Sequence, residues 1–208
     1  MRSKQLAEAE LIGAFIGDGF MNKYLRSPIV EFSGDKTLDK EYFETVLIPL
    51  LGTVLPGVPF HTSFHSDCHC RTIRLNSYAA AHFFLDFGFS YGPKSHTVHI
   101  PTRFYFDQEL LFRVIRGVFD ADGCVFLDTR PVYARPYPRI SFSTVSWTLY
   151  SQLVCILEPL FPLYLHEVKN RGAYVLEIYG YKNVEQWMKT IGFSNPRHLH
   201  KIQSILPL

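Results

Sequence analysis

The stretch Leu110-Leu-Phe-Arg-Val-Ile-Arg-Gly-Val-Phe-Asp-Ala-Asp-Gly-Cys-Val125 has a shorter counterpart near the start of the chain, Glu10-Leu-Ile-Gly-Ala-Phe-Ile-Gly-Asp-Gly-Phe20. In both, an apolar run suited to a helix carries small residues four positions apart and then ends in Asp-Gly. Residues four apart lie on one face of a helix, and small side chains there let two backbones approach closely. The two stretches are therefore expected to pack on each other as a pair of helices.

Each helix is expected to end at its Asp-Gly, which is Asp18-Gly19 in one copy and Asp122-Gly123 in the other. A glycine just past the last turn permits the left-handed conformation that stops a helix, whose last carbonyls lack partners within the helix. A carboxylate added to these carbonyls makes the hard oxygen ligand set that Mg²⁺ and Ca²⁺ prefer. One such motif is usually packing and a turn, but two side by side at negative helix ends indicate a cation site.

The two motifs resemble the paired signature helices of the LAGLIDADG homing endonucleases, specifically the single-chain form of archaeal introns. They match as Leu11-Ile-Gly-Ala-Phe-Ile-Gly-Asp-Gly19 and Ile115-Arg-Gly-Val-Phe-Asp-Ala-Asp-Gly123. The motif's first acidic position is Asp120 in the second copy but isoleucine in the first. We therefore interpret Asp120 as a structural or surface residue and assign the chemistry to Asp18 and Asp122.

Composition sets only broad bounds. At 208 residues and 47% hydrophobic, the chain can bury a core, either as one domain or as two small similar ones. A net charge of +2 and a pI near 8.3 are too weakly basic to argue for nucleic-acid binding on their own. The four cysteines follow no disulfide framework, and no signal peptide or membrane-spanning run is visible, so a cytoplasmic protein with reduced thiols is expected.

The order helix, two strands, helix, two strands, helix is expected twice. In the first half the predicted elements cover residues 4–18, 22–33 (two strands), 37–51, 58–64, 71–75 and 77–87. In the second half they cover residues 110–122, 125–142 (a strand pair), 147–161, 165–168, 173–179 and 182–191. This predicts an α+β fold of two pseudo-two-fold αββαββα repeats, residues 1–98 and 109–208, with a linker at 99–108. Two four-stranded antiparallel sheets would then form a DNA-binding saddle.

A strand pair of about 10 residues spans about 33 Å, and duplex DNA rises about 3.4 Å per base pair, so each half would follow about 10 base pairs. β-ribbons fit the major groove, where base identity is fully legible. Basic and polar residues gather on the predicted strands and turns, while several acids lie on the predicted helices. The expected DNA-binding residues are Asn22, Lys23, Arg26, Arg71, Arg74, Asn76, Arg130, Arg135, Arg139, Lys169 and Arg171.

The resemblance implies a monomeric, metal-dependent endonuclease for intron homing, which cuts each strand of a long asymmetric DNA target once and leaves short 3′ overhangs. Asp18 and Asp122 would each bind Mg²⁺, helped by the carbonyls of Gly17 and Ala121, and Ca²⁺ or Mn²⁺ would substitute for binding. A bound metal lowers the pKa of a water molecule and neutralises phosphate charge.

Basic residues beside such a site should stabilise the pentacoordinate phosphorus. Lys94 and Arg197 follow matching Gly-Phe-Ser segments, so we nominate them as catalytic residues, with Lys201 as a third candidate. Simple phosphate contacts or surface charge are the equally weighted alternative for all three.

Two other functions and one other site stay open. Some relatives are RNA splicing maturases, and a non-cleaving DNA-binding regulator on the same scaffold is a further alternative. The dense group of histidines and cysteines suggests zinc, but alternating strand residues would point to opposite faces, so strand surface or core residues are favoured. This group consists of His61, His65, Cys68, His69 and Cys70.

Overall fold

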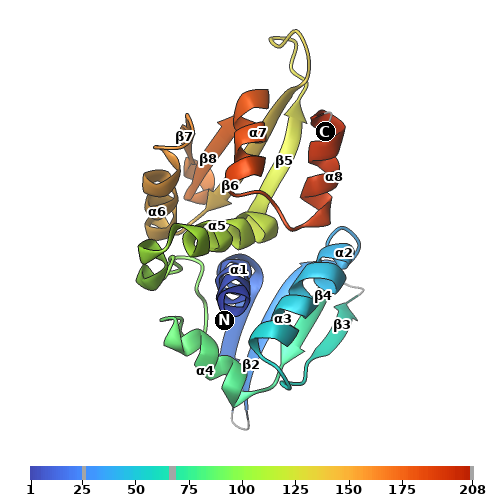
Figure 1. Cartoon of the computed structure of the whole chain (residues 1–208), viewed down its shortest axis with the longest axis vertical. Coiled ribbons are helices and arrows are strands. Elements are labelled where there is room, and N and C mark those ends of the chain that lie inside the picture. The colour runs from blue at the N-terminus through green and yellow to red at the C-terminus, as the bar shows by residue number, and fades with distance from the viewer. Residues whose placement is uncertain (25–26, 66–68, 207–208) are drawn as a thin grey trace.

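The computed structural model describes residues 1–24, 27–65 and 69–206. It contains two four-stranded antiparallel sheets, each backed by helices, and the two halves meet along one helix from each (Figure 1). The predicted fold class is confirmed. None of the helices in the described ranges is long and apolar enough to cross a membrane.

Both halves follow the same course through the sheet. The first half consists of α1 (Arg2–Asp18), β1 (Gly19–Lys23), β2 (Pro28–Asp35), α2 (Lys40–Tyr42), a π-helical turn (Phe43–Leu47), α3 (Ile48–Val54), β3 (His61–His65), β4 (Cys70–Leu75) and α4 (Tyr78–Asp86). A 3₁₀ helix (Thr102–Phe106) leads to the second half. That half consists of α5 (Gln108–Asp122), β5 (Gly123–Asp128), β6 (Tyr137–Thr144), α6 (Trp147–Leu157), β7 (Tyr164–Val168), β8 (Ala173–Tyr179), α7 (Tyr181–Thr190) and α8 (Pro196–Ile205). The strand orders are β1-β2-β4-β3 and β5-β6-β8-β7.

Helices α1 and α5 are in close backbone contact, as their small residues predict. A Cβ on Gly13 would lie 2.1 Å from the carbonyl oxygen of Val114, and one on Gly117 would lie 2.3 Å from that of Glu10. Such separations are far below van der Waals contact, so only glycine fits at either crossing point. The helices can approach this closely because neither has a side chain there.

The two glycines that follow these helices are not left-handed, and that expectation was wrong. Gly19 and Gly123 are both extended, with φ of −78° and −79°, because each helix passes directly into the first strand of its sheet. Glycine is needed for space instead. A Cβ would lie 2.5 Å from the Phe15 carbonyl oxygen in the first case and 2.3 Å from the Phe119 carbonyl oxygen in the second.

The second half ends in a helix that the sequence analysis missed. Asn195 caps α8 by accepting a hydrogen bond from the Arg197 amide, and proline occupies the first turn. This helix contacts β5 of its own half and α2 of the other (Figure 1). It therefore connects the two halves at a second place, away from the α1–α5 pair.

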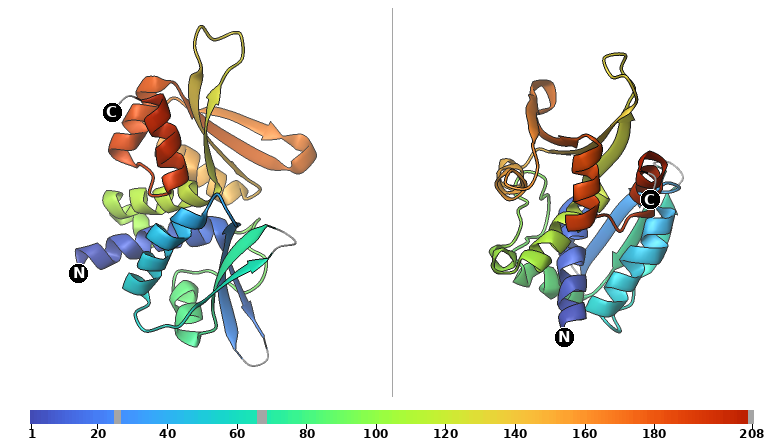
Figure 2. Two further views of the ribbon diagram at one scale, coloured as in Figure 1. Left: turned by 90° about the vertical axis from the view of Figure 1, so that its right-hand side faces the viewer. Right: turned by 45° about the horizontal axis from the view of Figure 1, so that its top comes forward.

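Each sheet has one face against helices and one face without them, as the left view of Figure 2 shows. On β2 and β4 the buried side chains Val30, Phe32, Ile73 and Leu75 face the helices. The residues between them in sequence face the other way. We call these two uncovered surfaces the open faces of the sheets.

The closeness of α1 and α5 gives a stability prediction. Gly13→Ala should lower the free energy of unfolding by about 3 kcal/mol, because the new methyl group forces two backbones apart. Chemical denaturation measures the change. The matched control is Gly52→Ala in α3, where a Cβ meets nothing within 4 Å and alanine should be neutral or stabilising by up to about 1 kcal/mol. Equal stabilities for the two variants would contradict the packing described here.

Candidate active site and open sheet faces

Asp18 and Asp122 end the paired helices and lie close together. A Cβ on Gly17 would be 3.2 Å from the Asp122 carboxyl carbon, so the second aspartate contacts the last turn of the first helix. The negative charge of Asp122 also acts on Asp18. The last turns of α1 and α5 therefore bring Asp18 and Asp122 near each other.

The surroundings of both carboxyl groups disfavour negative charge. Burial raises the pKa of Asp18 well above its ordinary value, and repulsion from Asp122 and Asp39 raises it further. Burial likewise raises the pKa of Asp122, while the ammonium of Lys94 lowers it. Two carboxylates held in this way gain stability from any added positive charge.

Lys94 supplies one positive charge at this point. Its ammonium donates hydrogen bonds to the carbonyl oxygens of Ile16 and of Gly17, the latter at 2.9 Å. It thereby satisfies carbonyls at the end of α1 that lack partners within the helix. Burial lowers the pKa of Lys94 to about 8. The Gly17 carbonyl, expected as a metal ligand, is thus already an acceptor for lysine and keeps one further lone pair.

Arg197 lies on α8 of the second half, whereas Lys94 belongs to the first half. Its guanidinium is 3.0 Å from Asp39, and its charge lowers the pKa of Asp18. Lys201 is exposed on α8, and its charge acts on His198. The structure therefore brings two of the three nominated cations toward the aspartates, and the position of Lys201 does not support a place beside them. The sequence did not indicate that Asp39 belongs to the site, because in the sequence it is only a polar residue before a predicted helix.

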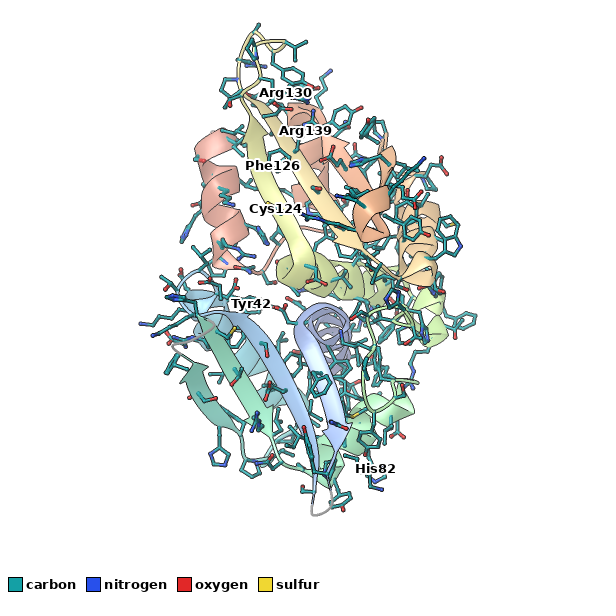
Figure 3. The ribbon with its side chains drawn as sticks, turned by 180° about the vertical axis from the view of Figure 1, so that it is seen from behind. Tyr42, His82, Cys124, Phe126, Arg130 and Arg139 are labelled. Atoms are coloured by element: carbon teal, nitrogen blue, oxygen red, sulfur yellow. The ribbon has the colours of Figure 1, made fainter. Side chains whose placement is uncertain are left out.

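Most of the expected DNA-binding residues are accessible. Asn22, Arg74 and Arg139 lie on the open faces of the sheets, as the strand register requires. Others are exposed at strand ends or in turns, namely Lys23, Asn76, Arg130, Arg135, Lys169 and Arg171. Figure 3 shows Cys124, Phe126, Arg139 and Arg130 following the β5–β6 pair outward from the centre of the molecule. Arg26 lies outside the described residues.

Arg71 does not belong to this set. It alternates with Arg74 along β4 and so points to the helix side of the sheet, where it is only 5% exposed. Its guanidinium is 3.1 Å from Glu44 and stacks over the ring of Phe64, with 4.5 Å to the centroid. Successive side chains along a strand point to opposite faces of the sheet, so Arg71 and Arg74 cannot both face DNA.

The expected segregation of charge is also incomplete, because carboxylates lie on the open faces. Glu31 accepts from Arg74 at 2.7 Å on the first sheet. On the second, Arg139 is 2.8 Å from both Asp128 and Glu177. In the described ranges these faces carry ion pairs at their centres, and exposed cations such as Lys23, Arg135 and Lys169 lie toward the strand ends and turns.

The histidine and cysteine group lies around the β3–β4 hairpin. Within the described ranges, no three His, Cys, Asp or Glu side chains stand close enough together to hold a metal ion. Cys68 lies outside the described residues, and His69 has a left-handed backbone with φ of 51°. His61 lies in β3 as expected, and Cys70 begins β4 one residue before the predicted strand, whereas His69 belongs to the turn and not to a strand.

Comparison with known protein families gives a match over residues 109–192, to the family described as LAGLIDADG-like domain. This segment, which runs from α5 to α7, is similar to LAGLIDADG-like domains. No curated protein sequence matches the chain. The resemblance predicted from the two signature helices is confirmed.

Solved structures share the fold across nearly the whole chain. I-DmoI in complex with DNA and Mn has a TM-score of 0.65 at 17% identity, and the match covers 92% of this chain and 98% of that one. I-DmoI in complex with DNA and Ca has a TM-score of 0.64 at 16% identity, over 90% of this chain and 90% of that one. Full-length DUF199/WhiA from Thermatoga maritima gives 0.61 at 16%, over 99% of this chain and 62% of that one.

The first acidic position of the second LAGLIDADG motif is structural. Asp120 is 1% exposed, and its carboxylate accepts the amide hydrogens of Ser194 at 3.0 Å and Asn195 at 2.9 Å. The Asn195 side chain returns a hydrogen bond to the Asp120 carbonyl at 2.9 Å. This reciprocal contact fixes the start of α8 to the end of the signature helix. Asp120 is therefore not a surface residue.

This contact predicts a difference between two substitutions. Asp120→Ala leaves two buried amides without an acceptor and should lower the free energy of unfolding by about 2 kcal/mol. Asp120→Asn keeps an acceptor oxygen and should cost less than about half of that. Thermal or chemical denaturation measures both, and an alanine variant as stable as the asparagine variant would show that the contact contributes nothing.

Proposed function

We propose that the protein is a divalent-metal-dependent, site-specific endonuclease acting on double-stranded DNA. The observation that carries the proposal is the pair Asp18 and Asp122, held together at the ends of packed LAGLIDADG helices between two uncovered sheets. Burial raises the pKa of both carboxyl groups, and two cations that act on them, Lys94 and Arg197, follow matching Gly-Phe-Ser segments.

The donor set fits a hard divalent cation. Asp18 and Asp122 would hold it, together with the Ala121 carbonyl and the remaining lone pair of Gly17. When bound, such an ion supplies an acidified water and charge neutralisation at the phosphate. Mg²⁺ is the expected ion for cleavage, and Ca²⁺ or Mn²⁺ would support binding. The carboxylates would hold the ion and orient the water, whereas the phosphate, which carboxylates repel, would be attracted by the ion and by Lys94.

Lys94 and Arg197 have different parts in this proposal. The Lys94 ammonium stands against Asp122 and the end of α1, where it can neutralise charge on a phosphate that approaches. Arg197 is engaged by Asp39 and balances the charge around Asp18. We therefore infer that Lys94 contacts the phosphate and that Arg197 positions the carboxylates.

A monomer with two similar halves would cut each strand once, with one aspartate per strand. Short 3′ overhangs, a long asymmetric target and a role in intron homing complete the proposal. The open faces supply base and phosphate contacts through Asn22, Arg74 and Arg139, with the exposed cations at strand ends holding the backbone.

The test begins with a randomised DNA duplex library. Wild-type protein should enrich a site in Ca²⁺ and cut it in Mg²⁺. Asp18→Asn and Asp122→Asn should each keep Kd within about tenfold, because the site is held mainly by contacts elsewhere, and should abolish double-strand cleavage. The matched control is Asp86→Asn at the exposed end of α4, which should cut as the wild type does.

Cleavage by either active-site variant at the wild-type rate would remove that aspartate from the chemistry. Tight DNA binding without cleavage by the wild type would favour a regulator instead. Enrichment of structured RNA but not of duplex DNA would favour a splicing maturase.

Lys94 provides a further prediction. Lys94→Met removes the ammonium but keeps the length of the side chain, and the cleavage rate should fall by about 100-fold because charge on the phosphate loses its partner. DNA affinity should change by less than about tenfold. Single-turnover rates and Kd measure the two effects. Lys182→Met on the exposed surface of α7 is the control, and a variant of Lys94 that cuts as fast as this control would contradict the role.

A further inference from the structure

The two open faces begin with matching rows of side chains beside the aspartates. Gly19 and Gly123 are opposite Phe32 and Phe142, so both strand pairs start at the same place relative to the signature helices. The next pairs across each sheet define what we call the inner row of each half. The inner row of the first half is Phe20, Glu31, Arg74 and His61, and that of the second is Cys124, Ser141, Glu177 and Tyr164.

The third member of the inner row carries opposite charge in the two halves. Arg74 occupies this position on β4, and Glu177 occupies it on β8. Both strands have the same place in the strand order, and both residues lie in the row next to the start of the first strand, so their positions in the two repeats are equivalent. The two repeats therefore share their strand register at this position but carry side chains of opposite charge.

Each of these side chains is held by an ion pair on the open face. Glu31 accepts from the Nε atom of Arg74 at 2.7 Å, and 45% of the arginine side chain is exposed. Arg139 donates to the Oε2 atom of Glu177 at 2.8 Å. Glu177 lines a hollow of the open face together with Phe126, Asp128, Tyr133, Arg139 and Tyr164. Pairing of this kind limits rotamer freedom. Glu177 is 8% exposed, at the wall of this hollow.

These groups match different edges of a base pair. Guanine presents two acceptors in the major groove, N7 and O6, which suit the fork of an arginine. Cytosine presents an amino group, which suits a carboxylate. The guanidinium has five N–H donors, so Arg74 keeps donors beyond those used by Glu31. Glu177 has a second oxygen beyond the one bound by Arg139.

We propose that Arg74 and Glu177 are specificity-determining residues that recognise the equivalent base pair of the two half-sites with opposite chemistry. Arg74 selects guanine, and Glu177 selects the cytosine of a G·C pair at the same distance on the other side of the cleavage centre. A palindromic site would present guanine to both residues, so the target is asymmetric at this row. The inference rests on the proposed DNA-binding function and names the bases that it reads.

The test compares DNA preferences rather than affinity alone. Binding sites are selected from the same randomised duplex library in Ca²⁺ with wild type, Arg74→Gln and Glu177→Gln. Glutamine pairs with adenine, so each variant should shift one position toward adenine by about tenfold and leave the rest of the site unchanged. The two shifted positions should lie at equal distances from the cleavage centre, with guanine lost in one case and cytosine in the other.

Lys169→Gln is the matched control. This residue is exposed in the β7–β8 turn, and its loss should weaken binding to all sequences and reduce the salt dependence without altering base preference. Circular dichroism and thermal melting confirm that each variant folds. Should Glu177→Gln fail to fold, Arg74→Gln still decides the guanine assignment, because its side chain is half exposed.

The possible outcomes distinguish base recognition by Arg74 and Glu177 from the proposed DNA-binding function. An enriched wild-type site with unchanged preference in the glutamine variants would overturn the inference and leave DNA binding intact. Shifts at unequal distances from the centre would overturn the equivalence of the two residues. Failure of the wild type to enrich any duplex would overturn the proposed function and the inference together.

Discussion

The structure depends on the close backbone approach of two helices at Gly13 and Gly117. A methyl group at either place would overlap a carbonyl oxygen of the partner helix, so the contact admits no other residue without a shift of the backbone. Packing at this distance also fixes the relative rotation of the helices. Their last turns must therefore end side by side, which is what places Asp18 next to Asp122 and makes the surroundings of both unfavourable for charge.

Each signature helix is followed directly by the first strand of its sheet, so the helix pair also fixes where the two sheets begin. Gly19 and Gly123 are extended and begin the first strand at once, so no loop intervenes between each aspartate and the open face beside it. Any duplex that follows both faces consequently passes the helix ends. The second connection, from α8 to α2 through Arg197 and Asp39, holds the halves together on another side.

Glycine spacing and hydrophobic periodicity predict the helix pair and the two sheets. They do not predict features that depend on side-chain direction or on tertiary contacts. The repeat predicted the order of helices and strands along each half as far as α7. Ser77 caps α4 by accepting a hydrogen bond from the Ala80 amide. Arg71 was misplaced because residues three apart on a strand face opposite sides, which separates it from Arg74. Helix α8 was missed because its cap, Asn195, is recognisable mainly through its contact with Asp120. Glu31 and Glu177 look like ordinary strand polar residues until the sheet pairs them with arginines.

The same constraint explains why the halves are alike in backbone and unlike in chemistry. Packing requires small residues at the helix crossing and glycine at the entry to each strand, so those positions must match. Open-face positions carry no such requirement, because the helices of the described ranges pack on the other face of each sheet. Arg74 and Glu177 can therefore differ in charge without cost to the helix pair, provided that each keeps a partner such as Glu31 or Arg139. A repeated scaffold with unconstrained faces is physically suited to read two different half-sites.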